Sequence, residues 1–221
     1  MSGPSVTVRV IGARREPVAV IDGFAPDPEA LRSAAATAAW RPAGDHYPGI
    51  AAPVPPDYLA RQRPLLATVL REVFGVGERV RVLDLRFAMV TTPPETLGLA
   101  QRLPHVDATE PGRLALVHFL APGGAEGTGF FRHRASGLEA IEPANEATYF
   151  ARLRAECATP PIGYPHGDTA LFERIAAFEG RYNRALLYRS HLLHSGLIPP
   201  GTPLPDDPRA GRLTVTGFFA S

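Results

Sequence analysis

Residues 184–196 read RALLYRSHLLHSG, and this stretch decides the fold that the sequence predicts. Its first part, 184–188, is an apolar run bounded by polar residues, which is typical of a buried β-strand. His191 and His194 follow at once. A proline-rich loop then leads to residues 212–219, which alternate polar and apolar side chains and predict a second strand. The end of the chain is therefore expected to be β-structure that carries histidines.

Outward from this stretch, short strands and a few helices are predicted without regular βα alternation. Residues 42–56 are rich in proline and glycine and predict a loop. The pattern favours an antiparallel barrel or double sheet with helices packed outside, a mainly β fold with flanking helices. The other predicted strands are 5–11, 18–21, 79–90, 113–120 and 129–132, and the predicted helices are 27–40, 57–74 (with Pro64 delaying or kinking its start), 145–157 and 168–178.

The composition excludes several classes of function. The net charge of +1 gives no global basic field for nucleic acid. All 23 basic residues are arginine, which suggests a bacterial source and excludes lysine chemistry. The single cysteine, Cys157, rules out an intrachain disulfide. No run of the length needed to cross a membrane and no signal peptide are seen, so a cytoplasmic protein is expected.

The most informative short motif is His105-Val106-Asp107. On an extended backbone these two polar side chains project from one face, roughly 6.5–7 Å apart along the strand, and can converge on one cation. An imidazole and a carboxylate are two of the three ligands in the two-histidine, one-carboxylate set that binds Fe(II) with open positions. Spacing alone leaves a chance occurrence open.

A third ligand would come from a distant part of the chain, and His191 and His194 are the two candidates. Beyond them, Arg212 and Thr214 share one face of the last predicted strand. An arginine that points into a barrel needs an anion, and a guanidinium with a hydroxyl beside it suits a carboxylate. The alternative is that Arg212 is an exposed edge residue. His118, within an apolar strand, is predicted to be a hydrogen-bonded core histidine.

The order His-x-Asp, distal His, Arg-x-Thr resembles that of the iron(II)- and 2-oxoglutarate-dependent oxygenases. Four further segments resemble parts of prolyl-hydroxylase-like and small, poorly characterised bacterial members. These are VAVIDGF at 18–24, HYPGI at 46–50, GTGFFRHR at 127–134 and NRALLY at 183–188.

The resemblance implies a double-stranded β-helix, or jelly roll, in a single domain over residues 1–221. Residues 1–78 would hold N-terminal strands and support helices, and 79–221 the core, with a helical insertion at about 138–180. His105, Asp107 and His194 would bind Fe(II), with His194 preferred over His191 because His-Ser-Gly matches the family pattern. Arg212, Thr214 and Tyr188 would bind 2-oxoglutarate.

The implied reaction uses O2 and 2-oxoglutarate, releases succinate and CO2, and hydroxylates a small molecule or peptide that the sequence does not identify. No nucleic acid or membrane partner is indicated. Two alternatives stay open: a cupin-type metal enzyme that does not use 2-oxoglutarate, and a non-catalytic binding protein on the same fold. Failure of 2-oxoglutarate to bind would favour the cupin-type enzyme.

Overall fold

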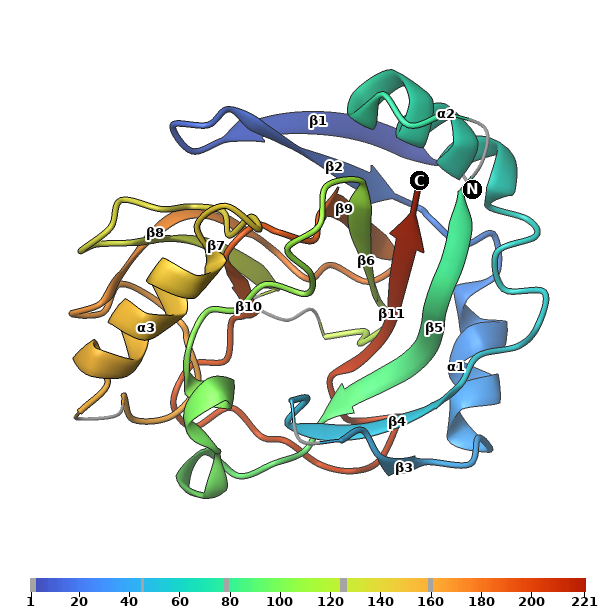
Figure 1. Cartoon of the computed structure of the whole chain (residues 1–221). Helices are drawn as coiled ribbons and strands as arrows, with labels where there is room; N and C mark the ends of the chain where they lie inside the picture. The colour runs from blue at the N-terminus through green and yellow to red at the C-terminus, as the bar shows by residue number, and fades with distance from the viewer. Residues whose placement is uncertain (1–2, 45, 78–79, 124–126, 159–160) are drawn as a thin grey trace.

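The structure is a computed structural model that describes residues 3–44, 46–77, 80–123, 127–158 and 161–221. Two antiparallel sheets form the core, and helices lie outside them (Figure 1). The strands are β1 (Ser5–Ile11), β2 (Glu16–Asp22), β3 (Arg41–Pro42), β4 (Gly49–Pro53), β5 (Arg81–Val90), β6 (Arg113–Phe119), β7 (Thr128–His133), β8 (Phe172–Phe178), β9 (Arg184–Arg189), β10 (His194–Gly196) and β11 (Leu213–Ala220), and the α-helices are α1 (Pro28–Ala36), α2 (Arg63–Phe74) and α3 (Glu146–Glu156).

The larger sheet has the strand order β1-β2-β9-β6-β11-β5-β4-β3, and the smaller has the order β10-β7-β8. Neighbours in both sheets that lie far apart in sequence, such as β9 beside β2 and β6, give the non-sequential pairing of a jelly roll. The mainly β, double-sheet fold predicted from the sequence is confirmed.

Alternation along the strands separates two layers of core. On β9, Ala185 and Leu187 pack in the cluster that α1 and α2 cover, whereas Leu186 and Tyr188 face the space between the sheets. The strand β11 follows the same rule, with Val215 toward the helices and Thr214 toward the interior cavity. Because side chains alternate with period two, each central strand buries both of its faces.

The predicted helix at 168–178 is wrong, because residues 172–178 form β8 of the smaller sheet. Ile175 is the extra residue of a β-bulge, at which the pairing steps from Arg174 to Ala176. A bulge shifts the alternation by one residue, so Phe172, Ile175 and Phe178 fall at a helix-like spacing. Among the described residues of the proposed insertion at 138–180, α3 is therefore the one helix.

The loop predicted at 42–56 contains the strand β4 and begins at the last residue of β3. A Cβ atom on Gly49 would lie 2.0 Å from the Met89 carbonyl oxygen, so glycine allows β4 to approach β5. The helix predicted to start at 57 begins at 63, with Pro64 in its first turn as expected. Residues 78 and 79, where the N-terminal region was predicted to end and a strand to start, lie outside the described residues. The single-domain division stays a prediction.

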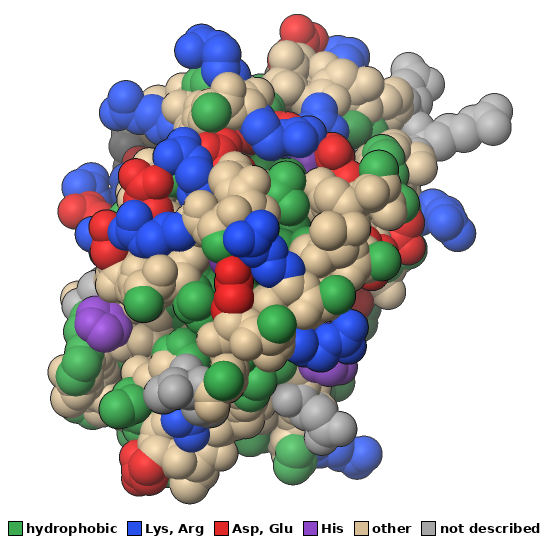
Figure 2. Space-filling view, turned by 60° about the vertical axis from the view of Figure 1, so that its left-hand side comes forward, with side chains coloured by type: hydrophobic (Ala, Val, Ile, Leu, Met, Phe, Trp, Pro, Cys, Tyr) green, Lys and Arg blue, Asp and Glu red, His purple; other side chains and the backbone are tan. Residues whose placement is uncertain are grey.

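Charged side chains of both signs are interspersed on the face that carries α3 (Figure 2). Ion pairs of the chain include those of Arg132 with Glu139 and Glu173, and of Arg152 with Glu156 on α3. Among the helices of the described ranges, none has the length and apolar character to cross a membrane.

Candidate metal centre and adjoining cavities

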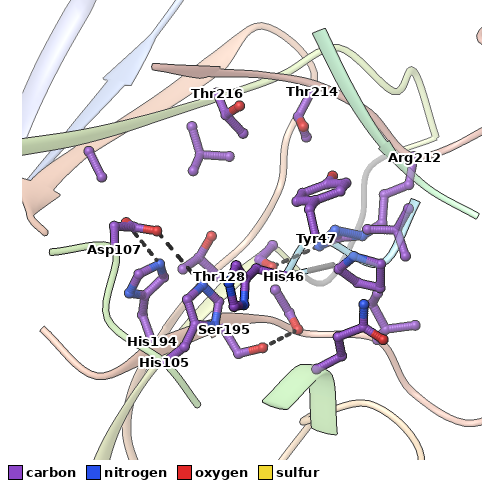
Figure 3. Close-up of a pocket in the computed structure, with 18 of the residues that line it drawn as sticks. His46, Tyr47, His105, Asp107, Thr128, His194, Ser195, Arg212, Thr214 and Thr216 are labelled. Carbon is purple, nitrogen blue, oxygen red and sulfur yellow. Dashed lines mark hydrogen bonds and ion pairs between the residues drawn. The ribbon is translucent and has the colours of Figure 1, made fainter. Parts of the chain in front are cut away.

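His105, Asp107 and His194 come together although their positions in the sequence are distant. One ligand-type atom from each residue lies within 4.8 Å of the others. The His194 Nε2 atom is 3.4 Å from Asp107 Oδ2, and the His105 Nε2 atom is 3.8 Å from Asp107 Oδ1. Figure 3 shows the three side chains converging at one end of a cavity.

Backbone hydrogen bonds fix this arrangement. His105 and His194 pair antiparallel, each backbone N–H donating to the other's carbonyl at 2.9 Å. The Asp107 N–H donates to the Ser190 carbonyl, also at 2.9 Å. On its other side, His194 pairs with Phe130 of β7. The His-x-Asp segment therefore lies along the edge of the smaller sheet, beside the residue that completes the cluster.

The chemistry of the three donors fits a divalent transition metal. The His194 Nδ1 atom lies 2.8 Å from the Leu192 carbonyl oxygen, so Nδ1 carries the proton and Nε2 presents a lone pair to the cluster. Asp107 Oδ2 is buried and has no hydrogen-bond partner among the described residues. A buried carboxylate oxygen without a donor is costly, and a cation would satisfy it. The residues therefore fit Fe(II) in the two-histidine, one-carboxylate pattern.

Burial shifts the protonation equilibria of the candidate ligands. It raises the pKa of Asp107 to about 6, against the opposing effect of the neighbouring His105. It lowers the pKa of His194 to about 4, which the hydrogen bond to Leu192 opposes. At neutral pH the cluster holds a carboxylate and a neutral His194 imidazole, which is the protonation state that metal ligation requires.

The alternative distal ligand, His191, points elsewhere. Its side chain is buried, and its Nε2 atom lies 3.8 Å from Glu16 Oε1 on β2. His191 and Arg189 together hold the pKa of Glu16 below its usual value despite burial. Geometry thus places His194 in the cluster and His191 outside it.

The cluster opens into a cavity of about 260 Å³, and Arg212 and Thr214 lie on the wall away from the cluster (Figure 3). Arg212, Thr214 and Tyr188 all line this cavity. The Arg212 Nη2 atom donates to the Gly127 carbonyl at 2.8 Å, and Thr214 Oγ1 donates to the Ala88 carbonyl at 3.0 Å. Tyr188 is buried against His194, with ring centroids 4.9 Å apart. The structure therefore brings all six predicted site residues to one cavity.

Sequence reasoning did not assign Tyr47 to the site, although it noted the segment 46–50. Tyr47 lies beside Arg212 and Thr214 (Figure 3). Burial raises the pKa of its phenol, an effect that these two neighbours oppose. Tyr164 also lines the cavity and donates to the Thr92 carbonyl at 2.7 Å. Both tyrosines come from loops, where no periodicity marks which face a side chain takes.

A second cavity, of about 820 Å³, adjoins the first. Both are lined by His105 and Asp107, and both also touch Arg86 and Phe218. The helix α3 forms much of its wall. The candidate metal centre thus stands between a smaller cavity with Arg212 and a larger one under α3.

Solved structures similar to this one include enzymes of the non-haem iron family. The α-ketoglutarate-dependent epimerase SnoN from nogalamycin biosynthesis is 13% identical over 94% of this chain and 80% of its own, with a TM-score of 0.51. HygX from Streptomyces hygroscopicus, solved with nickel and 2-oxoglutarate, is 16% identical over 92% of this chain and 82% of its own, with a TM-score of 0.48. The likeness to SnoN shows that this chain has the fold of the iron(II)/2-oxoglutarate-dependent enzymes.

No curated protein matches the sequence. Residues 2–219 match a protein family that is defined by sequence and described as a family of unknown function, DUF6445. Since the match spans nearly the whole length, the chain belongs to the DUF6445 family.

Proposed function

We propose that this protein is an Fe(II)- and 2-oxoglutarate-dependent oxygenase. The observation that carries the proposal is the convergence of His105, Asp107 and His194 on one point at the mouth of a cavity that holds an arginine–threonine pair. In the overall reaction, substrate R–H, O2 and 2-oxoglutarate give R–OH, succinate and CO2. Bound iron would supply the activation of O2, which protein side chains cannot achieve.

The chain's own residues account for ligand binding. His105, Asp107 and His194 would hold the metal through two imidazoles and one carboxylate, leaving coordination positions free. Arg212, with Thr214 beside it, would hold the far carboxylate of 2-oxoglutarate. A guanidinium offers a fork of donors that matches two carboxylate oxygens, and burial strengthens the pair. Tyr188 closes the apolar wall next to His194.

Anaerobic titration with Fe(II) and then 2-oxoglutarate tests the proposal. A visible charge-transfer band should appear only when both are present, and it should saturate at one equivalent per chain. Asp107→Ala should bind Fe(II) at least about tenfold more weakly and give no band, while its circular dichroism stays that of the wild type. Admission of O2 should then yield succinate from the wild type alone.

Two results would contradict the proposal. Iron binding with no effect of 2-oxoglutarate would favour a cupin-type enzyme. Absence of transition-metal binding would favour a non-catalytic binding protein.

A further inference from the structure

The larger cavity has a composition that defines the kind of molecule it can bind. Its wall is mostly apolar, and its volume of about 820 Å³ lies in the range of pockets for small molecules. The apolar and aromatic side chains that line it include Leu99, Leu103, Tyr149, Phe150, Leu153, Cys157, Leu193 and Phe218. The helix α3 supplies Tyr149, Phe150, Leu153 and Arg154 to this wall.

Apart from the candidate metal ligand Asp107, the formally charged side chains that line this cavity are basic. Arg86 and Arg154 line it, and the one acidic residue among its described lining residues is Asp107. Asp107 is a candidate metal ligand, so a bound metal ion would neutralise its charge. The charge left for a ligand is therefore positive, and complementarity calls for an anion.

Unsatisfied polar atoms lie along the walls of the two adjoining cavities. Six buried side-chain atoms lack a hydrogen-bond partner among the described residues, and four belong to lining residues: Arg86 Nε and Asp107 Oδ2 on both cavities, Tyr149 Oη on the larger and Thr216 Oγ1 on the smaller. Apart from the carboxylate, each can donate a hydrogen bond. Buried polar groups are nearly always paired in native proteins, so these atoms point to a ligand that supplies acceptors.

Two of these donors are neighbours. Arg86 on β5 pairs in register with Thr216 on β11, so their side chains share one face of the sheet. Arg86 Nε lies 3.3 Å from the Asp84 carboxylate in a geometry that forms no hydrogen bond, and Asp84 is 44% exposed to water. Along the same sheet face, Thr214 and Thr216 project toward the interior from one strand (Figure 3). Arg86 and Thr216 thus repeat, at the wall between the two cavities, the donor pair of Arg212 and Thr214.

We propose that the larger cavity binds the molecule that is oxidised, and that this molecule is a small apolar carboxylate. The carboxylate binds Arg86, which lines both cavities, and Thr216, which lines the smaller cavity beside it, and the apolar body packs in the larger cavity against Phe150, Leu153 and Leu193. This inference rests on the proposed oxygenase function. A fork of guanidinium donors and one hydroxyl matches the two oxygens of a carboxylate.

The test is calorimetric binding to the anaerobic Fe(II) protein with 2-oxoglutarate at saturation, which keeps the Arg212 site filled. The probes are octanoate and 4-phenylbutyrate, each beside its alcohol, amine and phosphate-monoester counterpart. The wild type should bind the carboxylates at least about tenfold more tightly than the alcohols and amines. Arg86→Gln should remove this preference, and Thr216→Val, which deletes only a hydroxyl, should weaken carboxylate binding several-fold.

Arg152→Gln is the matched control, because Arg152 lies on α3 but not on the cavity wall. It should bind the probes as the wild type does. Equal affinity for acid and amine, no probe binding at millimolar concentration, or an unchanged preference in both Arg86→Gln and Thr216→Val would overturn the proposal. Tighter binding of the phosphate monoesters would replace carboxylate by phosphate as the anion. If 2-oxoglutarate fails to bind the wild type while the Arg86-dependent preference persists, the oxygenase proposal fails and the binding site stands.

Discussion

His191 and His194 are close in sequence, but their different partners give them different roles. The His194 ring is oriented by the Leu192 carbonyl and packs against His105, with ring centroids 4.5 Å apart. His191 lies beside Glu16 in a charged group that includes Arg189. We therefore expect substitutions of these two histidines to affect different properties.

His194→Ala should weaken Fe(II) binding by more than about tenfold, because it removes one of three ligands. His191→Ala should leave Fe(II) affinity within a few-fold of the wild type and instead lower the free energy of unfolding, by about 1 kcal/mol, since Glu16 loses a buried neighbour. Competition with a chelator and urea unfolding measure the two quantities. The reverse pattern would make His191 the ligand.

Arg212 is the residue that separates a 2-oxoglutarate enzyme from other metal-binding jelly rolls. Losing one partner of a buried charge pair costs about 2–5 kcal/mol. Arg212→Ala should therefore raise the dissociation constant for 2-oxoglutarate at least about tenfold, with Fe(II) affinity unchanged. Arg212→Lys should restore part of the affinity, since an ammonium cannot reproduce the fork. Unaltered 2-oxoglutarate binding by Arg212→Ala would place the anchor elsewhere.

At the scale of elements, Gly127 joins three parts of the site. It precedes β7 with φ of +81°, and a Cβ atom there would lie 1.8 Å from the Phe178 carbonyl oxygen at the end of β8. Its own carbonyl accepts from Leu197, just after β10, and from Arg212. A side chain at this position would therefore push apart the strands that position the arginine.

Gly127→Ala should lower the free energy of unfolding by more than about 2 kcal/mol, because it combines left-handed strain with a backbone clash. Gly201→Ala is a matched control: its φ is also +81°, and a Cβ atom there would have no atom of the described residues within 4 Å. Gly201→Ala should lower the free energy of unfolding only by the left-handed backbone strain, about 1 kcal/mol. Urea unfolding of both variants measures the difference. Equal losses would show that the approach of Phe178 is unimportant.

Elements were predictable where side chains alternate without interruption. On β11 the period of two is intact, and both the strand and the inward direction of Thr214 follow from it. The strand β9 was predicted instead from a short apolar run bounded by polar residues. The bulge at Ile175 breaks the period on β8, and the strand therefore resembled a helix. The short β4 was missed because Gly49 and the surrounding prolines suggest a loop, although β5 supplies its hydrogen-bond partners.

At the scale of the whole molecule, the metal cluster was predictable and the walls of the cavities were not. His105 and Asp107 have a local spacing that indicates their chemistry, and Arg212 directly precedes β11, the strand that carries Thr214. Tyr47 and Arg86 reach the same cavities from distant segments. Their roles depend on strand order, which a single sequence does not encode in any local pattern.

His118 connects the sheet to the N-terminal region and gives the fold a predictable response to acid. As expected for a core histidine, it is fully buried on β6. Its Nε2 donates to Asn183 Oδ1 at 3.0 Å, which leaves Nδ1 to accept from the Tyr58 hydroxyl at 2.9 Å. Asn183 in turn accepts from the backbone N–H of Ala25. Protonation of the ring would place a charge in this buried site and would reverse the bond to Tyr58, because Nδ1 would then donate and the hydroxyl oxygen would have to accept.

Burial lowers the pKa of His118 to about 4, while the bond to Asn183 opposes the shift. In the unfolded chain the ring titrates near its ordinary value of about 6.5. Between these values the unfolded state binds more protons. The contribution of neutral His118 to the free energy of unfolding is therefore fully present above about pH 6.5 and is lost as the pH drops toward 4.

His118→Gln removes this titration. The stability advantage of the wild type over that variant should shrink by up to about 3 kcal/mol across this window, as measured by urea unfolding. Histidine-selective NMR of the wild type should show a neutral His118 ring at pH 5; a charged ring there, or a constant stability difference, would contradict the prediction.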